Sequence, residues 1–265
     1  MEGLSFFIAG DGARIAYRFD GREDAPVLML SNSIATTLRM WDGVTPDLAE
    51  HFRVLRYDTR GHGASDAPAG AYSIDRLGRD VIELLDALEL ERVHFLGLSL
   101  GGFIGQWLGV HAPERIDRLI LSNTSSHLGP PELFDQRIAE LAQTDDMSAM
   151  AEMFMSNWFP ARMIEARLPV VDAFRTMVLS TPPQGLAGSF AAVRDADLRR
   201  PVALIAAPTL VIAGEYDTVT AASHGEAIAA AIPGARYLSL PSVHMPNVET
   251  APAFVGAVRE FLVDR

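Results

Sequence analysis

The sequence predicts an α/β fold, with a mostly parallel central sheet, helices on both faces of that sheet and a helical insertion. Apolar runs of strand length alternate with stretches of helical periodicity in residues 1–124 and again in residues 199–265. Residues 125–198 instead carry a helical pattern that prolines interrupt. We therefore expect an α/β core made of residues 1–124 and 199–265, with residues 125–198 inserted as a cap, or lid.

The core elements are expected in a regular order. Residues 4–9 and 13–19 flank a Gly-Asp-Gly turn, which is typical of a hairpin. Ser73 can cap the helix that follows it, because its hydroxyl can accept a backbone N–H. Further strands are expected at 26–30, 53–57, 91–96, 118–122, 207–213 and 236–240, and helices at 73–90, 103–108, 220–231 and 251–263.

The insertion is rich in methionine. Methionine is flexible and adapts to irregular apolar surfaces, which suits a lid over a pocket. The simpler interpretation, which we expect for most of these residues, is that they pack the insertion against itself. Six of the ten methionines of the chain lie there: Met147, Met150, Met153, Met155, Met163 and Met177.

Composition excludes several kinds of site. The 265 residues are 49% hydrophobic and 21% charged, which is ordinary for a globular protein large enough to bury a sizeable core. The chain has no cysteine, so a disulfide framework, a thiolate zinc site and a cysteine nucleophile are excluded. No His-Glu-x-x-His motif or acidic cluster indicates a metal, and no Gly-x-Gly-x-x-Gly motif indicates a nucleotide. We therefore expect neither a metal nor a cofactor.

Charge and hydropathy limit the partners. The formal net charge of −12 should repel nucleic acid and anionic membrane surfaces, so we expect neither as a partner. The first residues lack the basic segment and the long apolar run of a signal peptide. No stretch approaches the ~20 apolar residues of a membrane span. These observations together predict a cytoplasmic protein.

The motif that carries chemistry is Gly-Leu-Ser-Leu-Gly at residues 97–101. It stands between an expected strand and an expected helix, where Gly-x-Ser-x-Gly forms the nucleophile elbow of an α/β-hydrolase. The turn is so sharp that side chains at Gly97 and Gly101 would collide. Ser99 would stand above the sheet, at the start of a helix whose N–H groups point toward the reacting atoms. An incidental serine in a strand-to-helix turn is the simpler alternative, but partner residues follow in the right order.

An acid and a histidine should follow the serine in the chain, each beyond the carboxyl end of a strand. Asp217 follows the strongest late strand and is the preferred acid, with Glu215 as the alternative. A simpler role for Asp217 is to cap the next helix. His244 follows the last expected strand, whereas His224 lies within an expected helix. The order therefore predicts a triad of Ser99, Asp217 and His244.

Each predicted residue has a chemical role. A serine hydroxyl is a weak nucleophile at neutral pH, so His244 would take its proton and later return it to the leaving group. Asp217 would hold the histidine tautomer and stabilise the imidazolium. The backbone N–H of Leu100, just after Ser99, would be one donor to the oxyanion. The second is expected from the loop at 31–34, and the Ile34 N–H is the candidate.

Longer strings of residues make a more specific resemblance. Over nearly its whole length the chain resembles the 3-oxoadipate enol-lactonases, which are α/β-hydrolases. The resemblance implies a cofactor-free serine hydrolase that opens 3-oxoadipate enol-lactone to 3-oxoadipate through an acyl-enzyme, in the β-ketoadipate pathway of aromatic catabolism. The strings that carry it lie at residues 30–34, 40–42, 51–63, 97–102, 105–109, 157–159, 183–185 and 194–198.

The resemblance implies a small anionic lactone as substrate, so a cation is expected in the cap. Arg137 is the first candidate, although it could equally form a surface ion pair with Glu140. Trp158 is expected as an apolar wall of the substrate site. Ser33 and His127 are further candidates for contact with the substrate.

Departures from the family pattern keep other functions open. Ala35 stands where a glycine is usual, and the chain also departs at residues 125–127 and 245–246. Because these positions are expected near the pocket, a carboxylesterase or lactonase acting on a different small ester or lactone is the alternative. A ligand receptor with a silent or slow triad is a third hypothesis.

Overall fold

The sheet of the computed structural model, which describes residues 3–263, has the strand order β1-β2-β4-β3-β5-β6-β7-β8. β1 and β2 pair antiparallel, as do β2 and β4, and the remaining neighbours pair parallel. The prediction of a mostly parallel sheet is therefore confirmed. The strands are β1 Ser5–Ile8, β2 Arg14–Asp20, β3 Val27–Ser31, β4 Arg53–Tyr57, β5 Val93–Leu98, β6 Ile116–Ser122, β7 Thr209–Gly214 and β8 Arg236–Leu240.

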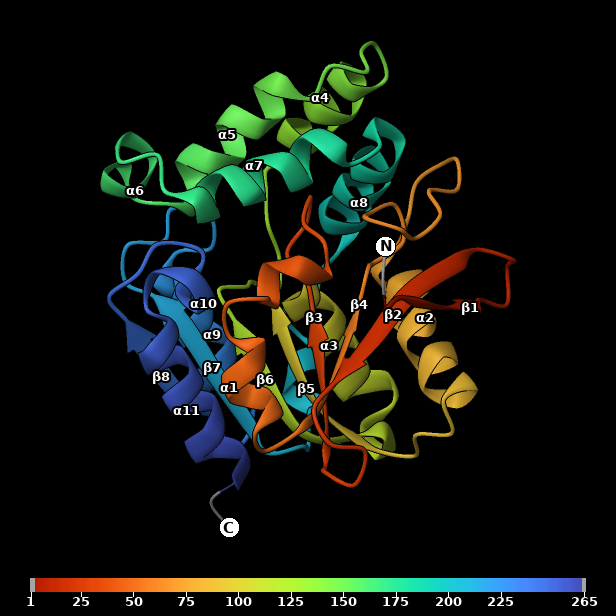
Figure 1. The fold of residues 1–265 in the computed structure, drawn as a ribbon, viewed down its shortest axis with the longest axis vertical. Coiled ribbons are helices and arrows are strands. Elements are labelled where there is room, and N and C mark those ends of the chain that lie inside the picture. Colours follow the sequence, from red (N-terminus) through yellow and green to blue (C-terminus); the bar gives the residue numbers. More distant parts are fainter. Residues whose placement is uncertain (1–2, 264–265) are drawn as a thin grey trace.

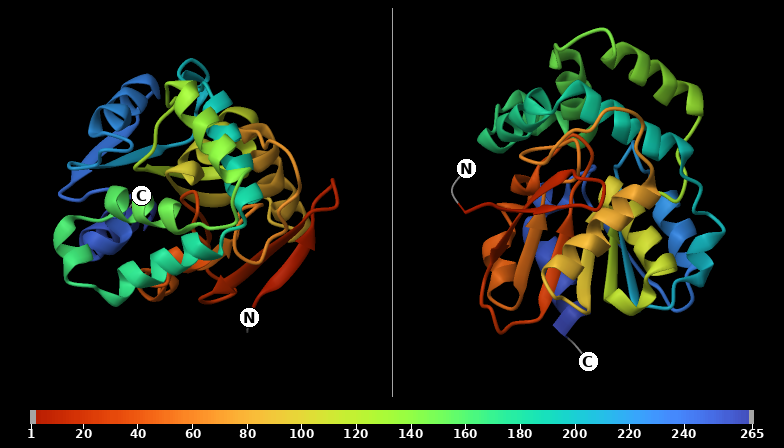
Figure 2. Two further views of the ribbon diagram at one scale, coloured as in Figure 1. Left: turned by 90° about the horizontal axis from the view of Figure 1, so that it is seen from above. Right: turned by 90° about the vertical axis from the view of Figure 1, so that its right-hand side faces the viewer.

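Helices cover both faces of the sheet (Figure 1). On one face, α1 (Thr45–Ala49) packs against α11 (Ala251–Val263). On the other, α2 (Ile74–Ala87) packs against α3 (Leu100–His111), and α9 (Ala222–Ala231) lies against β7 and β8. The central strands β5 and β7 are buried at every position, because a parallel sheet covered on both faces needs continuous apolar strands. Figure 2 shows the β1–β2 hairpin at one edge of the sheet.

Five helices between β6 and β7 lie together above one end of the sheet (Figure 1). We call them the cap helices. Three begin with proline at their first position, where the missing N–H costs nothing and the fixed φ already suits a helix. The cap helices are α4 Pro131–Leu141, α5 Ser148–Trp158, α6 Ala161–Glu165, α7 Pro169–Ser180 and α8 Pro183–Asp195.

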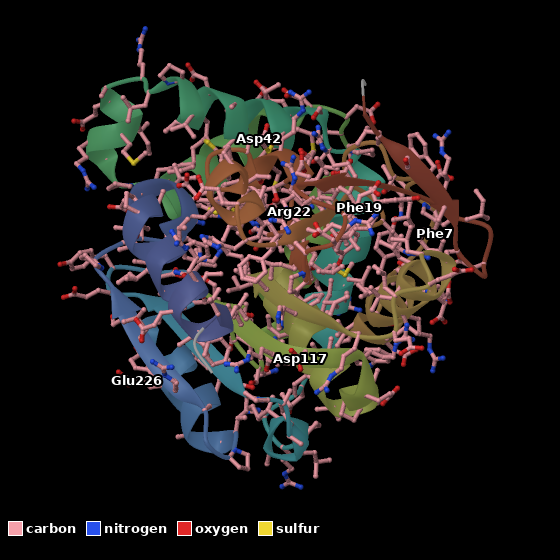
Figure 3. All side chains as sticks on the ribbon, turned by 60° about the horizontal axis from the view of Figure 1, so that its bottom comes forward. Phe7, Phe19, Arg22, Asp42, Asp117 and Glu226 are labelled. Carbon is pink, nitrogen blue, oxygen red and sulfur yellow. The ribbon has the colours of Figure 1, made fainter. Side chains whose placement is uncertain are left out.

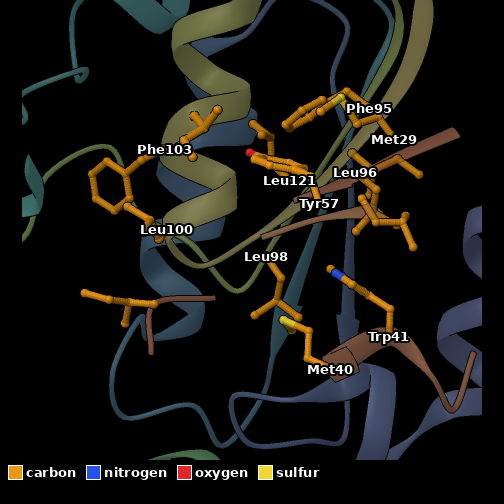
Figure 4. Close-up of a cluster of buried hydrophobic side chains, with 14 of the residues drawn as sticks. Met29, Met40, Trp41, Tyr57, Phe95, Leu96, Leu98, Leu100, Phe103 and Leu121 are labelled. Atoms are coloured by element: carbon orange, nitrogen blue, oxygen red, sulfur yellow. The ribbon is translucent and has the colours of Figure 1, made fainter. Parts of the chain in front are cut away.

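The core beneath the elbow is a dense apolar cluster that includes Met29, Phe95 and Leu121 (Figure 4). The Tyr57 hydroxyl within it is paired with the Ser31 hydroxyl at 2.8 Å. Burial raises the pKa of Tyr57 above its ordinary value, so this phenol stays neutral. Near the start of β5, the Nδ1 of His94 lies 3.2 Å from a carboxylate oxygen of Asp117, which Figure 3 labels.

Most boundaries lie within two residues of the expected ones, and the larger differences are at two helices. α2 ends at Ala87, three residues before the expected end, and α3 extends three residues beyond the expected helix at each end. β5 runs two residues beyond the expected strand. The strand continues because Gly97 and Leu98 are buried against β6, and the helix begins immediately after Ser99. The capping role of Ser73 is confirmed, since its hydroxyl accepts the Arg76 N–H at 3.1 Å.

Candidate active site

The predicted site residues lie at the carboxyl ends of neighbouring strands. Ile34 follows β3, Ser99 follows β5, Asp217 follows β7 and His244 follows β8. The parallel strands that these residues follow are neighbours in the sheet, together with β6. Their loops therefore converge at the carboxyl ends of the strands, beneath the cap helices. Asn123, which follows β6, completes the row.

The elbow is strained and held in place. Ser99 has φ 56° and ψ −113°, a left-handed conformation that costs a non-glycine residue about 1–3 kcal/mol. Its carbonyl oxygen accepts the Thr124 hydroxyl at 2.8 Å. A Cβ on Gly97 would overlap the carbonyl oxygen of Gly101, and a Cβ on Gly101 would overlap that of Ser31. Both glycines are therefore required by close backbone contacts around the serine.

His244 and Asp217 form a buried pair. The Nδ1 of His244 lies 2.7 Å from Asp217 Oδ2, which also accepts the Asn123 amide and the Thr220 hydroxyl, each at 2.9 Å. Asp217 Oδ1 accepts the backbone N–H groups of Val219 and Thr220 at 2.8 and 3.0 Å. Burial alone would raise the pKa of Asp217, but the charge of His244 and these hydrogen bonds outweigh it and lower the pKa to about 2.

This arrangement selects between the two candidate acids. Glu215 is exposed and its side chain makes no contact with His244, whereas Asp217 is 4% exposed and bonded to it. Asp217 does not cap α9, whose first residue is Ala222; it caps the turn at 217–220 instead. One oxygen of Asp217 thus orders the turn, and the other holds the histidine.

The second ring nitrogen of His244 is not engaged by the described residues. His244 Nε2 is buried and has no hydrogen-bond partner within residues 3–263. With the proton on Nδ1, which donates to Asp217, Nε2 carries a lone pair. Hydrogen bonds between a nucleophile and its base are often long before substrate binds, and they tighten in the complex. Nε2 is therefore the nitrogen that the predicted removal of the Ser99 proton would use.

The two backbone N–H groups predicted to bind the oxyanion belong to residues that line the same cavity as Ser99, and neither has a hydrogen-bond partner among the described residues. Leu100 is the first residue of α3, so its N–H has no carbonyl partner within the helix. In the loop after β3, the Ser33 N–H points to the sulfur of Met40 at 3.2 Å. The Ala35 N–H donates to His62 Nε2 at 2.9 Å. The Ile34 N–H between them makes no hydrogen bond within the part of the chain that the structure describes.

Ser99 opens into a cavity of about 300 Å³ between the core and the cap helices. Its core wall consists of Ile34, Ser99, Leu100, Phe103 and Val219. Its cap wall is almost entirely apolar, and among the described residues that line it Arg137 and Asn157 have the only polar side chains. The cap wall consists of Leu128, Gly129, Leu133, Phe134, Arg137, Met153, Phe154, Asn157, Phe190 and Val193. The shape and lining suit a small, mostly apolar molecule with a polar group directed at the cap.

Arg137 is the one cap residue, among those the sequence singles out for substrate contact, that the structure places on this cavity. Its guanidinium also pairs with Glu140 at 3.0 Å, and both side chains are 40% exposed. The two expectations for Arg137 are therefore compatible. The five methionines other than Met153 are buried in the insertion, and Met153 lines the cavity.

Trp158 does not line the cavity, contrary to expectation. It is 1% exposed and packs on Phe154, with 4.6 Å between ring centroids, so it supports the wall from behind. One residue along a helix turns the side chain by about 100°. Asn157 therefore faces the cavity while Trp158 faces the aromatic cluster of the cap.

Ser33 and His127 also lie away from the cavity. The Ser33 hydroxyl is buried without a hydrogen-bond partner in the described range. His127 lines a separate hollow with His224 and Arg199, and its Nδ1 bonds the Ala196 carbonyl at 3.0 Å. Neither side chain is among those that face Ser99.

Sequence reasoning missed residues that support the site. Asn123 and Thr220 both donate to Asp217, and Asn157 is one of two polar groups on the cap wall. A signal for Asn123 was present, because it directly follows the strand that separates β5 from β7. Its φ of 43° also favours asparagine over most other residues.

The described residues offer neither a metal-binding cluster nor a membrane-spanning helix. Within residues 3–263, no cluster of three or more His, Cys, Asp or Glu side chains could hold a metal ion. No helix in the same range is both long and apolar enough to cross a membrane.

Comparison with known proteins identifies the family. A family model described as the alpha/beta hydrolase fold matches residues 26–250. The 3-oxoadipate enol-lactonase 2 of Acinetobacter baylyi is 37% identical over 242 residues, covering 91% of this chain and 90% of the relative. The solved structure of a hydrolase from Pseudomonas aeruginosa PA01 is 61% identical, with a TM-score of 0.97 over 98% of each chain.

A second solved structure points to the same family. The enol-lactonase from Burkholderia xenovorans LB400 is 39% identical, with a TM-score of 0.95 over 98% of this chain and 100% of the other. The fold and this likeness over nearly the full length agree with each other. The chain therefore belongs to the α/β-hydrolase family and, within it, to the family of the 3-oxoadipate enol-lactonases, and it is an ester-hydrolysing enzyme.

Proposed function

We propose that this enzyme opens 3-oxoadipate enol-lactone to 3-oxoadipate through an acyl-enzyme on Ser99, as a step of the β-ketoadipate pathway of aromatic catabolism. The observation that carries the reaction type is the 2.7 Å contact between His244 and Asp217 in the loops after β8 and β7, at the same end of the sheet as the Ser99 elbow. The choice of substrate is supported by the relatives, which carry the name enol-lactonase.

The first half of the reaction forms an ester with the enzyme. Ser99 Oγ attacks the lactone carbonyl while His244 Nε2 takes its proton. The Ile34 and Leu100 N–H groups stabilise the tetrahedral oxyanion. The C–O bond of the ring then breaks, and the imidazolium returns its proton to the departing enolate oxygen. The enol formed in this way tautomerises to the ketone.

The second half releases the product. A water molecule gives its proton to His244 Nε2 and attacks the acyl carbon, and collapse of the intermediate returns the proton to Ser99 Oγ. Asp217 stabilises the imidazolium in both halves. Its carboxyl group can do so at any pH well above 2, since the pKa is held at about 2 by His244 and the surrounding donors.

The cap wall supplies a place for the substrate carboxylate. Arg137 and Asn157 are the polar side chains opposite Ser99 across an otherwise apolar surface. The ion pair of Arg137 with Glu140 lies at the surface, where solvent screening leaves such pairs with little net contribution to stability. A substrate carboxylate can therefore replace Glu140 at little cost. A local cation is needed because the net charge of −12 opposes entry of an anion.

The test is the ultraviolet decay of 3-oxoadipate enol-lactone with purified enzyme, run beside Ser99→Ala and beside a neutral aryl ester. We expect rapid decay that the substitution abolishes. If the lactone survives and the aryl ester is hydrolysed by Ser99, the substrate proposal is wrong and the hydrolase mechanism stands.

A different small ester or lactone is the second candidate. It is favoured by one observation, that the only cation on the cap wall is already paired with a carboxylate. A neutral substrate would leave that pair intact. Comparable rates for a neutral lactone and the carboxylated one would support this candidate. If no compound is turned over, a ligand receptor becomes the better interpretation.

A further inference from the structure

The loop that carries Ile34 contains a second strained residue. Ala35 has φ 56°, in the left-handed region that residues with a Cβ rarely adopt. It is fully buried between β3 and the short helix at Leu38–Trp41. Because alanine does not favour this conformation, contacts from elsewhere must hold it.

His62 makes the contact that holds Ala35. Its Nε2 accepts the Ala35 N–H at 2.9 Å, and its Nδ1 lies 3.1 Å from the Arg60 carbonyl oxygen. A carbonyl can only accept, so the proton is on Nδ1 and the lone pair is on Nε2. Burial lowers the pKa of His62 to about 4, so the ring remains a neutral acceptor at neutral pH.

The segment that carries His62 is itself anchored. Asp58 accepts the Leu38 N–H at 2.7 Å and the Ala64 N–H at 2.8 Å, which ties this segment to the short helix that follows the Ile34 loop. Arg60 forms two hydrogen bonds of 2.7 Å with Asp80 of α2. The imidazole therefore presents Nε2 from a fixed position.

The other side of the loop is held by Met40, which belongs to the buried cluster drawn in Figure 4. The sulfur of Met40 accepts the Ser33 N–H at 3.2 Å, and the Thr36 hydroxyl donates to the Ser33 carbonyl oxygen at 2.7 Å and lies 3.0 Å from the same sulfur. The N–H groups on both sides of Ile34 are thus engaged by buried side chains. Within the part of the chain that the structure describes, the Ile34 N–H makes no hydrogen bond, and Ile34 lines the cavity that Ser99 opens into.

We propose that His62 is a positioning residue for the reaction: by accepting the Ala35 N–H, it fixes the loop so that the Ile34 N–H points at the developing oxyanion. The inference rests on the proposed function in one respect, the use of Ile34 as an oxyanion donor. His62 is not a base in the reaction, because it does not line the cavity and both of its ring nitrogens are engaged.

The test compares His62→Leu, which removes the acceptor, with His62→Gln, whose side-chain oxygen can accept the same N–H. His94→Leu is the matched control, since His94 is also buried but lies at the opposite end of β5. The values of kcat and KM are measured for the enol-lactone and for a neutral aryl ester. The dissociation constant of phenylboronic acid, which becomes tetrahedral on Ser99, and the melting temperature are measured in parallel.

We expect His62→Leu to lower kcat by about 30- to 300-fold with KM changed less than threefold, because loss of one oxyanion donor costs about 10²–10³ in kcat. Boronic acid affinity should fall with kcat, and His62→Gln should recover at least tenfold. His94→Leu should keep kcat within threefold. If His62→Leu does not fold, His62→Gln and His62→Asn give the same comparison, since the shorter amide cannot reach Ala35.

Two results would overturn the inference while the proposed function stands. One is a kcat of folded His62→Leu equal to that of His94→Leu. The other is a loss of kcat in His62→Gln as large as that in His62→Leu or, where His62→Leu does not fold, as large as that in His62→Asn. If the wild type opens no enol-lactone but hydrolyses the aryl ester through Ser99, only the substrate proposal fails and the His62 comparison is made on the ester. Absence of any Ser99-dependent hydrolysis would overturn both.

Discussion

The two walls of the cavity are built on different principles. On the core wall, Ser99 and Leu100 stand on backbone that buried strands and close glycine contacts hold rigid. The cap wall is made of apolar side chains from separate helices, and some of it is open to solvent: Leu133 is 57% exposed and Arg137 is 40% exposed. The contrast indicates that the core wall sets the reaction and the cap wall sets which molecule undergoes it.

The largest effect should come from the core wall. Ser99→Ala is expected to lower kcat by at least about 10⁴-fold, because the other groups of the site cannot form the acyl-enzyme without the nucleophile. The substitution removes only the side-chain oxygen of residue 99, and the backbone conformation there is set by its neighbours. The melting temperature should therefore stay within a few degrees of the wild type. Substantial turnover by a folded Ser99→Ala enzyme would refute the assignment.

Next in size is the loss expected for the acid. Asp217→Asn should lower kcat by about 10⁴-fold, because an amide in place of the carboxylate favours the wrong histidine tautomer. The exposed neighbour provides the control: Glu215→Gln should be indistinguishable from the wild type. A larger loss in Glu215→Gln than in Asp217→Asn would reverse the choice of acid.

The core side of the site could be read from the sequence because each of its residues follows a strand. Parallel strands end at one edge of a sheet, so Asp217 and His244 were expected to meet near Ser99, and the structure places them in contact. Asn123 follows the same rule. Strand order cannot predict which residues near Asp217 donate hydrogen bonds to it, because that depends on how the turn at 217–220 folds.

The cap side could not be predicted in the same way. Which residue of a helix faces a cavity depends on the rotation of that helix, and tertiary packing sets this rotation. Asn157 and Trp158 are adjacent in the sequence, yet one faces the cavity and the other is buried behind Phe154. Size and aromatic character indicated Trp158 as a wall residue, but those same properties favour its burial in the core of the cap.

A third effect, on stability, should come from His62, which holds the loop that carries Ile34. His62 has an ordinary pKa of about 6.5 when unfolded and about 4 when folded, so between these values the unfolded chain binds more protons. The free energy of unfolding should therefore fall as the pH falls from 6.5 to 4, by about 3 kcal/mol from this group. In His62→Gln that part of the pH dependence should be missing.

Urea unfolding of the wild type and His62→Gln at pH 7 and at pH 4.5 measures this difference. Other titrating groups are common to both proteins and cancel in the comparison. Parallel curves for the wild type and His62→Gln would mean that His62 titrates in the folded protein much as it does in the unfolded chain.

The smallest effect should come from the cap wall, and it should be selective. Arg137→Ala is expected to raise KM for the carboxylated lactone about tenfold, which corresponds to about 1.4 kcal/mol of binding, with kcat within threefold. For a neutral aryl ester neither constant should change. Glu140→Ala is the matched control, because it breaks the same ion pair but leaves the cation free, so KM for the lactone should stay equal or fall. An unchanged KM in Arg137→Ala would show that the cap wall does not use this cation, and Asn157 would then be the remaining polar contact for the carboxylate.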